Sequence, residues 1–287
     1  MGSLEGHLIP GSMFILGAVW WFIGEILQNN RNNADRARRR ATLRGSSPFV
    51  QPVWYSCRGA RLSKLPVEPI VKVIIAVLSV ICELLEHDQT ALFDDNGEFV
   101  AEHLDNYAHS AMYAFFGLSG VVDLVMWYAL LPLPPKFDYL VMSLAFWFEG
   151  FLFFFHLHGR DELNVRLHTI LYIVVFVTAG VFLLAVISDQ LMQFMSFLKP
   201  YLLCLQGGWF YQAGFVLFGP DPWKNSPSNV EFLGIAFAVH ALTWFVVHLI
   251  FHIACYRCFI KKPLLNERRL SEESSGEEVD SVMLEEL

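Results

Sequence analysis

Histidines and carboxylates stand at the ends of several long apolar stretches in this 287-residue chain. The clearest example is the segment EGFLFFFHLHGRDELNVRLH, which begins at Glu149, contains His156 and His158, and ends at His168. Glu149 and His156 are seven residues apart, so they share one face of a helix. An ionisable side chain within a membrane is costly unless it faces the protein interior and finds a partner there. We therefore expect both side chains to point inward.

Imidazole nitrogens and carboxylate oxygens are the ligands that zinc and other divalent transition metals take in proteins. The predicted helices bring further histidines to about the depth of His156. The predicted metal ligands are His109, His156, His168, His240 and Glu149. Glu149 is expected to act either as a ligand or as the general base. A metal in such a site would lower the pKa of its bound water and supply a nucleophile at the boundary between lipid and water.

Several polar residues nearby are candidates for alternative ligands or for orienting the ligands. Asp105, His109 and Tyr113 recur at intervals of four residues, so they lie on one face of a helix. The glutamines of the stretch LQGGWFYQAGF need partners within a helix bundle, whereas its glycines permit close helix approach. The alternative residues are Glu83, His158, Asp105, Tyr113, Gln212 and His7.

Other functions fit the same residues. His240, Trp244, His248 and His252 recur every four residues, which is compatible with haem ligation if a facing helix supplies a second histidine. A series of histidines and carboxylates is also typical of a transporter for protons or metal ions. A non-enzymatic structural or trafficking factor, with histidines that are only hydrogen-bonded near the membrane surface, is the third alternative. Few polar residues fall in the predicted inner halves of the helices, and this favours a site over a path.

The elements that must position these residues follow from the composition. Hydrophobic residues make up 55% of the chain and aromatic residues 15%, with a mean hydropathy of +0.43. A soluble domain is less apolar, and the apolar residues come in blocks long enough to cross a bilayer as helices. The sequence predicts an all-α, polytopic membrane protein with a seven-transmembrane-helix bundle in residues 1–260. The predicted spans are residues 13–27, 67–85, 106–131, 137–156, 167–187, 201–218 and 230–255.

The charges predict the orientation of the bundle. The loop between the first two spans holds nine Lys and Arg residues against the single acid Asp35, while residues 86–105 hold seven acids and no Lys or Arg. Because basic loops stay on the cytosolic side, we expect the N-terminus outside or luminal and the C-terminus cytosolic. Residues 261–287 are acidic and are predicted to form a disordered cytosolic tail. Nothing in the distribution of arginines and aromatics indicates nucleic-acid binding.

Five segments together resemble the transmembrane protein 45 family. They are GHLIPGSMFILGAVWW, AHSAMYAFFGLSGVVDLV, FEGFLFFFHLHGRDEL followed by His168, LQGGWFYQAGFVLFGP, and His240 after an apolar run. The resemblance covers nearly all of the spans from Gly6 to about His240, in the same order. It implies a multi-pass protein of endomembranes (Golgi, endosome or lysosome, sometimes the plasma membrane) without an established biochemical activity. His248 and His252 are not part of the resemblance, which weakens the haem alternative.

The sequence therefore predicts a zinc or other divalent-metal site between the outer halves of the third, fourth, fifth and seventh spans. Seven-helix intramembrane zinc hydrolases that act on lipid amides are an analogy for such a pocket. The predicted partners are membrane lipids and a lipid-like small molecule as substrate.

Overall fold

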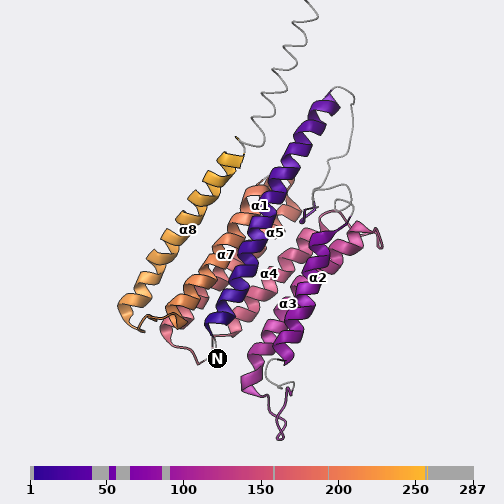
Figure 1. The fold of residues 1–287 in the computed structure, drawn as a ribbon. Helices are drawn as coiled ribbons and strands as arrows, with labels where there is room; N and C mark the ends of the chain where they lie inside the picture. Colours follow the sequence, from indigo (N-terminus) through magenta and orange to yellow (C-terminus); the bar gives the residue numbers. More distant parts are fainter. Residues whose placement is uncertain are drawn as a thin grey trace, which may run out of the picture. The chain divides into compact units, whose positions relative to one another are not determined.

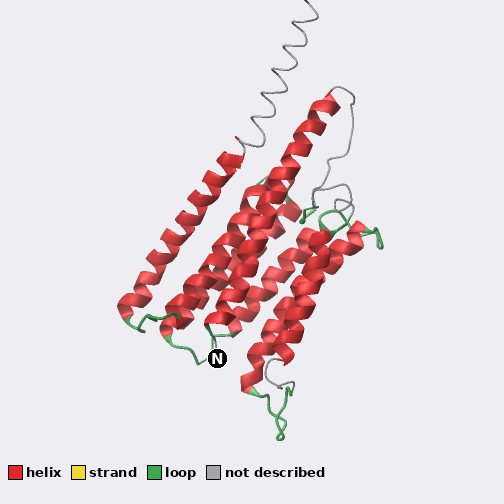
Figure 2. Ribbon diagram, viewed as in Figure 1, coloured by secondary structure: helices red, strands yellow, loops and turns green. Residues whose placement is uncertain are grey.

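The computed structural model describes residues 3–40, 52–55, 65–85, 91–157, 159–192, 194–255 and 257. This part of the chain is helical, and it contains one isolated bridge between Phe93 and Phe99 but no strand (Figures 1 and 2). Short helices at Ala101–His103 (η2) and Asp189–Met192 (α6) join the long ones. The long helices are α1 (Leu4–Arg40), α2 (Val67–Leu85), α3 (Leu104–Trp127), α4 (Phe137–Phe155), α5 (Glu162–Ile187), α7 (Met195–Phe218) and α8 (Pro227–Cys255).

Each predicted span coincides with one long helix of the structure, and the bounds predicted for α2 are those observed. Five helices are long and apolar enough to cross a membrane: α1 over Leu4–Ile26, α3, α4, α5 and α8. These helices indicate an integral, multi-pass membrane protein. The helix α2 carries Glu68, Lys72 and Glu83, and α7 is rich in glycine, glutamine and tyrosine. Crossing of the membrane by α2 and α7, and the orientation, stay predictions.

Five helices (α1, α3, α5, α7 and α8) begin two to nine residues earlier than the hydropathy predicts, and the extensions of α1 and α5 bear on the site. The helix α5 starts at Glu162 because the side chain of Asp161 caps it, accepting a hydrogen bond from the backbone N–H of Asn164 at 2.9 Å. The helix α1 starts at Leu4 and continues through Pro10. Both extensions lie at the end of the bundle where the predicted site residues gather, and the extension of α1 brings His7 onto a helix.

The described helices divide into two compact units, residues 1–24 with 47–244, and residues 25–46 with 245–287. The second unit contains His248 and His252, whose ring centroids are 5.8 Å apart on α8. All the other predicted site residues belong to the first unit, which the following paragraphs describe.

Helices α1 and α7 pack closely in the first unit because glycines face each other. A Cβ added to Gly207 would lie 2.7 Å from the carbonyl oxygen of Gly11, and a Cβ added to Gly11 would lie 2.9 Å from that of Gly207. Such backbone approach needs residues without a side chain. It brings Ser12 of α1 to the hydroxyl of Tyr211, at 2.7 Å.

A layer of phenylalanines fills the middle of the first unit. The ring of Phe14 on α1 lies 5.8 Å from that of Phe210 on α7 and 6.1 Å from that of Phe116 on α3. Phe146 on α4 completes the layer at 5.2 Å from Phe116. Since Phe14 and His7 are seven residues apart on one helix face, this layer lies about 10 Å along α1 from the histidine.

Candidate functional site

Four histidine rings form a row at one end of the first unit. His7 comes from α1, His109 from α3, His156 from the residue that ends α4, and His168 from α5. The ring centroids of His7 and His168 are 5.5 Å apart, those of His168 and His156 are 6.4 Å apart, and those of His156 and His109 are 5.7 Å apart. The structure thus brings together three of the predicted ligands and adds His7, which the sequence offered only as an alternative.

The Nδ1 atom of every ring in this row faces an oxygen. In His7 it lies 2.8 Å from the carbonyl oxygen of Ser3, and in His168 it lies 3.0 Å from that of Asn164. A carbonyl can only accept, so Nδ1 carries the proton in both rings, and Nε2 keeps its lone pair. This tautomer is the one in which a histidine binds a metal through Nε2.

His156 makes two charged contacts. Its Nδ1 is 3.0 Å from a carboxylate oxygen of Asp105, and its Nε2 is 2.6 Å from Nη2 of Arg160. A guanidinium can only donate, so Nε2 accepts and the proton sits on Nδ1, pointing at Asp105. Arg160 also donates from Nε to the His156 carbonyl at 2.9 Å. In this arrangement the lone pair of His156 is occupied by Arg160.

His109 pairs with a carboxylate from the neighbouring helix. Its Nδ1 is 3.3 Å from Oε1 of Glu83 on α2. The side chain of Asn106 donates to the Glu83 carbonyl at 2.8 Å and so ties the same two helices together. Asp105 and His109 are 40% and 34% exposed, so this edge of the row is open to its surroundings.

Glu149 lies apart from the row. It is 2% exposed, and its Oε1 accepts a hydrogen bond from Nε2 of Gln206 on α7 at 2.6 Å. Its Oε2 and the amide oxygen of Gln206 are buried without a hydrogen-bond partner among the described residues. Glu149 and His156 do share a face of α4, but seven residues of helix separate them by about 10 Å.

His240 lies on the opposite side of α7 from Glu149. Its ring is 5.6 Å from that of Trp209 and packs where Gly208 leaves room, whereas Gln206 faces α4. Two residues of helix are about 200° of rotation, so Gln206 and Gly208 face opposite ways. The helix that His240 faces, α7, contains no histidine, and this leaves the haem alternative without a second ligand on that helix.

The remaining alternatives are spread around the row. Tyr113 lies one helical turn beyond His109 on α3. Gln212 is half-buried on α7, and its side chain makes no hydrogen bond to the described residues. His158 lies outside the described residues.

Residues 135–257 match the model of a Family of unknown function (DUF716). The matched part comprises α4 to α8, with His156, His168, Glu149, Gln206 and His240. The rest of the row, His7 and His109 with their neighbours, precedes it. The match supports the resemblance found in the sequence for this part of the chain, and it adds no activity.

The row meets only part of what a metal site requires. Two imidazoles bound through nitrogen to one tetrahedral zinc have ring centroids roughly 5 Å apart. The pair His7 and His168 is close to this spacing. Among the residues that the structure describes, no three or more His, Cys, Asp or Glu side chains form a group that could hold a metal ion. The spacing of the His7 and His168 rings is therefore compatible with two ligands of one metal ion.

Arg160 is the residue that sequence reasoning missed. It is four residues after His156 and is one of three basic residues that the predicted topology places outside. The closeness of the two residues in sequence was the available signal, but α4 ends before both of them. Its effect on His156 depends on the turn after α4, which ends the helix at Phe155 and folds Arg160 back.

Proposed function

We propose that this chain is a multi-pass endomembrane protein of the transmembrane protein 45 family whose histidine row binds a divalent transition metal, zinc in the first instance. His7 and His168 are the primary ligands through Nε2. His156 is the third ligand, available when Arg160 moves away, and His109 is a fourth candidate at the exposed edge. Asp105 holds the His156 ring in its tautomer.

One observation carries this proposal: all four rings direct Nδ1 at an oxygen, at distances of 2.8 to 3.3 Å. In metal proteins such oxygens fix the ring and leave Nε2 for the ion. His103, outside the row, also bonds through Nδ1 to a carbonyl, so the support comes from the recurrence of this contact in four neighbouring rings. Four rings from four helices that direct Nδ1 at an oxygen at one end of a bundle point to a common occupant.

The reaction class that suits such a site is hydrolysis of a lipid-like substrate. His7 and His168, with or without His156, would leave a coordination position of the metal open for water, and the bound metal would lower the pKa of that water. Asp105 and His156 form a dyad that can accept a proton from that water. When His7 and His168 alone hold the metal and Arg160 has moved away, Nε2 of His156 is the general base, and His156 is then not a ligand. Glu149 is not assigned this role, because it is hydrogen-bonded to Gln206 and lies about 10 Å along α4 from His156.

Transport of metal ions or protons is the competing function. The phenylalanine layer disfavours it. An ion that left the row along the bundle axis would meet Phe14, Phe116, Phe146 and Phe210 in mutual ring contact. Hydrophobic layers of this kind stop charged species unless they open. The other alternative is a structural or trafficking factor that binds no metal. Measurement of bound zinc distinguishes it from the proposed metalloprotein.

The test is metal analysis of the purified full chain in detergent. After equilibration with zinc and desalting, plasma mass spectrometry should find about one zinc per chain. The double variant His7→Ala, His168→Ala should lose it, whereas His103→Ala should keep it. His103 is a matched control because it is also buried, with Nδ1 bonded to the Ala91 carbonyl, but lies outside the row. Zinc retained by the double variant, or absent from the native chain, would overturn the proposal. A Soret band would instead support haem.

A further inference from the structure

A short stretch of loop, residues 52–55, is buried at the other end of the first unit. Val53 is fully buried, and Trp54 and Tyr55 are nearly so. The backbone N–H of Val53 donates to Oδ2 of Asp138 at 2.8 Å, and the Val53 carbonyl accepts from Nζ of Lys199 at 2.9 Å. The N–H of Tyr55 donates to Glu68 at 2.9 Å. Side chains of three helices thus hold this stretch by its backbone.

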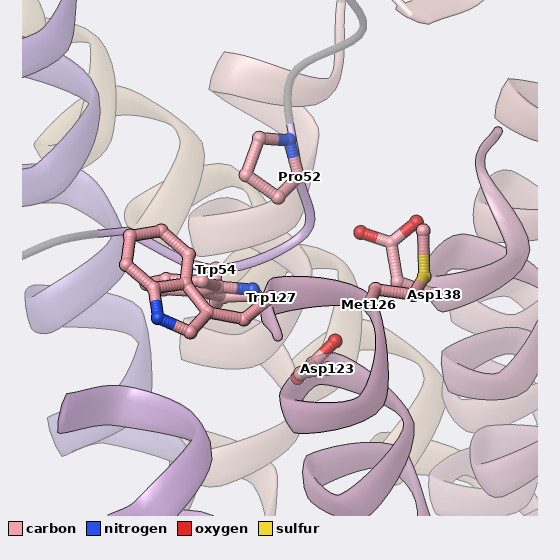
Figure 3. A pocket seen from close by; sticks show the side chains of 6 residues that line it. All are labelled: Pro52, Trp54, Asp123, Met126, Trp127 and Asp138. Carbon is pink, nitrogen blue, oxygen red and sulfur yellow. The ribbon is translucent and has the colours of Figure 1, made fainter. Parts of the chain in front are cut away.

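A pocket of about 180 Å³ opens beside this stretch, between the end of α3 and the start of α4. Trp54 and Trp127 lie on one side of it, and Asp138 lies on the other side with Met126 (Figure 3). The rings of Trp54 and Trp127 meet edge to face, with centroids 5.2 Å apart. The lining residues are Pro52, Trp54, Asp123, Met126, Trp127 and Asp138.

The charges around the pocket do not cancel. Asp123 forms an ion pair with Lys72. Asp138 is 4% exposed, and among the described residues it has only backbone N–H donors and no Lys, Arg or His within ion-pair distance. Lys136, two residues earlier, donates to the carbonyls of Ala185 and Val186 instead.

Lys199, another cation among the described residues near Asp138, makes contacts of its own. The Lys199 ammonium donates to Val53 and lies over the rings of Trp21, Tyr55 and Tyr139, 4.6 to 5.7 Å from their centroids. Glu68 receives two indole N–H groups at 2.7 Å in addition to Tyr55. Among the residues that the structure describes, three carboxylates (Glu68, Asp123, Asp138) and two ammonium groups (Lys72, Lys199) lie in this region, a formal excess of one negative charge.

The pocket lies where a membrane surface is expected. Trp127 is the last residue of α3, a candidate span, and it is 41% exposed. The turn that follows is exposed and apolar, with Tyr128, Leu130 and Leu131 each more than half exposed. Tryptophan and tyrosine favour the level of the lipid headgroups, and leucines beside them reach the acyl chains.

We propose that this pocket binds the trimethylammonium group of a choline phospholipid. Aromatic faces beside a carboxylate are how proteins bind quaternary ammonium ions, and a monocation would balance the excess charge. The volume is below the roughly 300–1,000 Å³ of pockets that enclose whole small molecules. It suits a headgroup whose acyl chains stay in the bilayer along the apolar turn. This site is separate from the histidine row, and its test does not depend on metal.

The test uses the purified full chain in a maltoside detergent, which carries no choline. Binding of dihexanoyl phosphatidylcholine, below its micelle concentration, is measured by tryptophan fluorescence and by native mass spectrometry. Dihexanoyl phosphatidylglycerol and choline chloride are the two comparison ligands. Phosphatidylcholine should bind at least about tenfold more tightly than either. Equal binding of phosphatidylglycerol would overturn the proposal. Free choline that binds as tightly as the lipid would overturn the lipid as the occupant and keep an ammonium site.

Two variants locate the binding in the pocket. Trp127→Ala removes an exposed wall and should weaken phosphatidylcholine binding by about tenfold, while Trp127→Phe should retain most of it. Trp147→Ala is the matched control, since Trp147 is an exposed tryptophan of α4 that packs on Phe176. Asp138→Asn should abolish the preference over phosphatidylglycerol. Because Asp138 also holds Val53, that variant is compared only if its thermal unfolding stays cooperative. Unchanged binding in Trp127→Ala would overturn the proposal by itself.

Discussion

The protonation of His156 follows from its neighbours, and it makes Arg160 the residue that controls the row. A guanidinium on Nε2 blocks the atom that would bind a metal. Zinc binding through His156 must therefore displace Arg160 or proceed without His156.

Arg160→Gln should raise the affinity for zinc by about tenfold, because it releases Nε2 of His156 as a third ligand. The measurement is a competition between the purified chain and a chelating dye. Arg166→Gln serves as control, since Arg166 is an exposed arginine on α5. An affinity that falls in Arg160→Gln would show that Arg160 supports the site instead of closing it.

The pair Glu149 and Gln206 yields a prediction of stability. Two of its oxygens are buried without partners, and an ionised carboxylate here has a single hydrogen bond. Glu149→Gln keeps the shape of the side chain without an ionisable group, and it supplies an N–H group for the oxygen of Gln206. We expect it to raise the free energy of unfolding by about 1–3 kcal/mol.

Gln206→Leu should have the opposite effect and lower the free energy of unfolding by about 2–3 kcal/mol, since it leaves Glu149 without its hydrogen bond. Thermal unfolding in detergent measures both variants. If Glu149→Gln were as destabilising as Gln206→Leu, the carboxylate would have a partner that the described residues do not contain. A stabilising Glu149→Gln would indicate that the carboxylate is retained for a function.

At the scale of helices, the contact between α1 and α7 sets the position of His7. Gly11 is four residues after His7 and so lies on the same side of α1. Its backbone meets that of Gly207, and any side chain at Gly207 forces the two helices apart.

Gly207→Ala should lower the free energy of unfolding by about 1–3 kcal/mol and weaken zinc binding at the same time. Thermal unfolding and metal analysis are the measurements. Gly180→Ala is the control, because a Cβ added at Gly180 on α5 meets nothing within 4 Å. If Gly207→Ala lowers the stability but leaves zinc binding unchanged, the contact between α1 and α7 does not determine the position of His7 in the row.

The sequence predicted the helices well because hydropathy reports the length of apolar segments directly. It also brought His109, His156 and His168 together correctly, since all three stand at the same end of predicted helices. It grouped Glu149 with them because residues i and i+7 share a face. A shared face says nothing of the distance along the axis, and that distance separates the two.

The surroundings of His240 and His7 could not be predicted from the sequence. Their surroundings depend on which helices are neighbours, and periodicity carries no such information. The structure places α8 against α7, so His240 faces Trp209, and it places α1 against α7 and α5, so His7 meets His168. Neither outcome could be read from the spacing of residues within one helix.

At the scale of the whole molecule, the number of helices that cross the membrane is a prediction. Single cysteines in three loops test it through reaction with a membrane-impermeant maleimide. Asp95→Cys lies between α2 and α3, Lys224→Cys between α7 and α8, and Gln190→Cys in α6. All three positions are exposed. The first is in a turn held by Asp94, whose pKa is lowered by hydrogen bonds from the backbone N–H groups of Glu98 and Asn96.

With seven crossings, the cysteines at positions 95 and 224 should react from the luminal side and the one at 190 from the cytosolic side. Selective permeabilisation of the plasma membrane distinguishes the two sides, and the wild-type chain gives the background from its own cysteines. A cytosolic cysteine at 95 would show that α2 does not cross. If the cysteines at positions 190 and 224 react from the same side of the membrane, α7 does not cross it.

The burial of Lys199 has a practical consequence for chemical proteomics. Lys199 is 1% exposed, and its amine contacts the Val53 carbonyl and lies over the rings of Trp21, Tyr55 and Tyr139. An acylating reagent cannot reach the amine while that stretch stays in place. Acylation of Lys199 in whole cells would therefore count the chains whose loop has left the bundle, and it would serve as a marker of incomplete assembly that is independent of any activity.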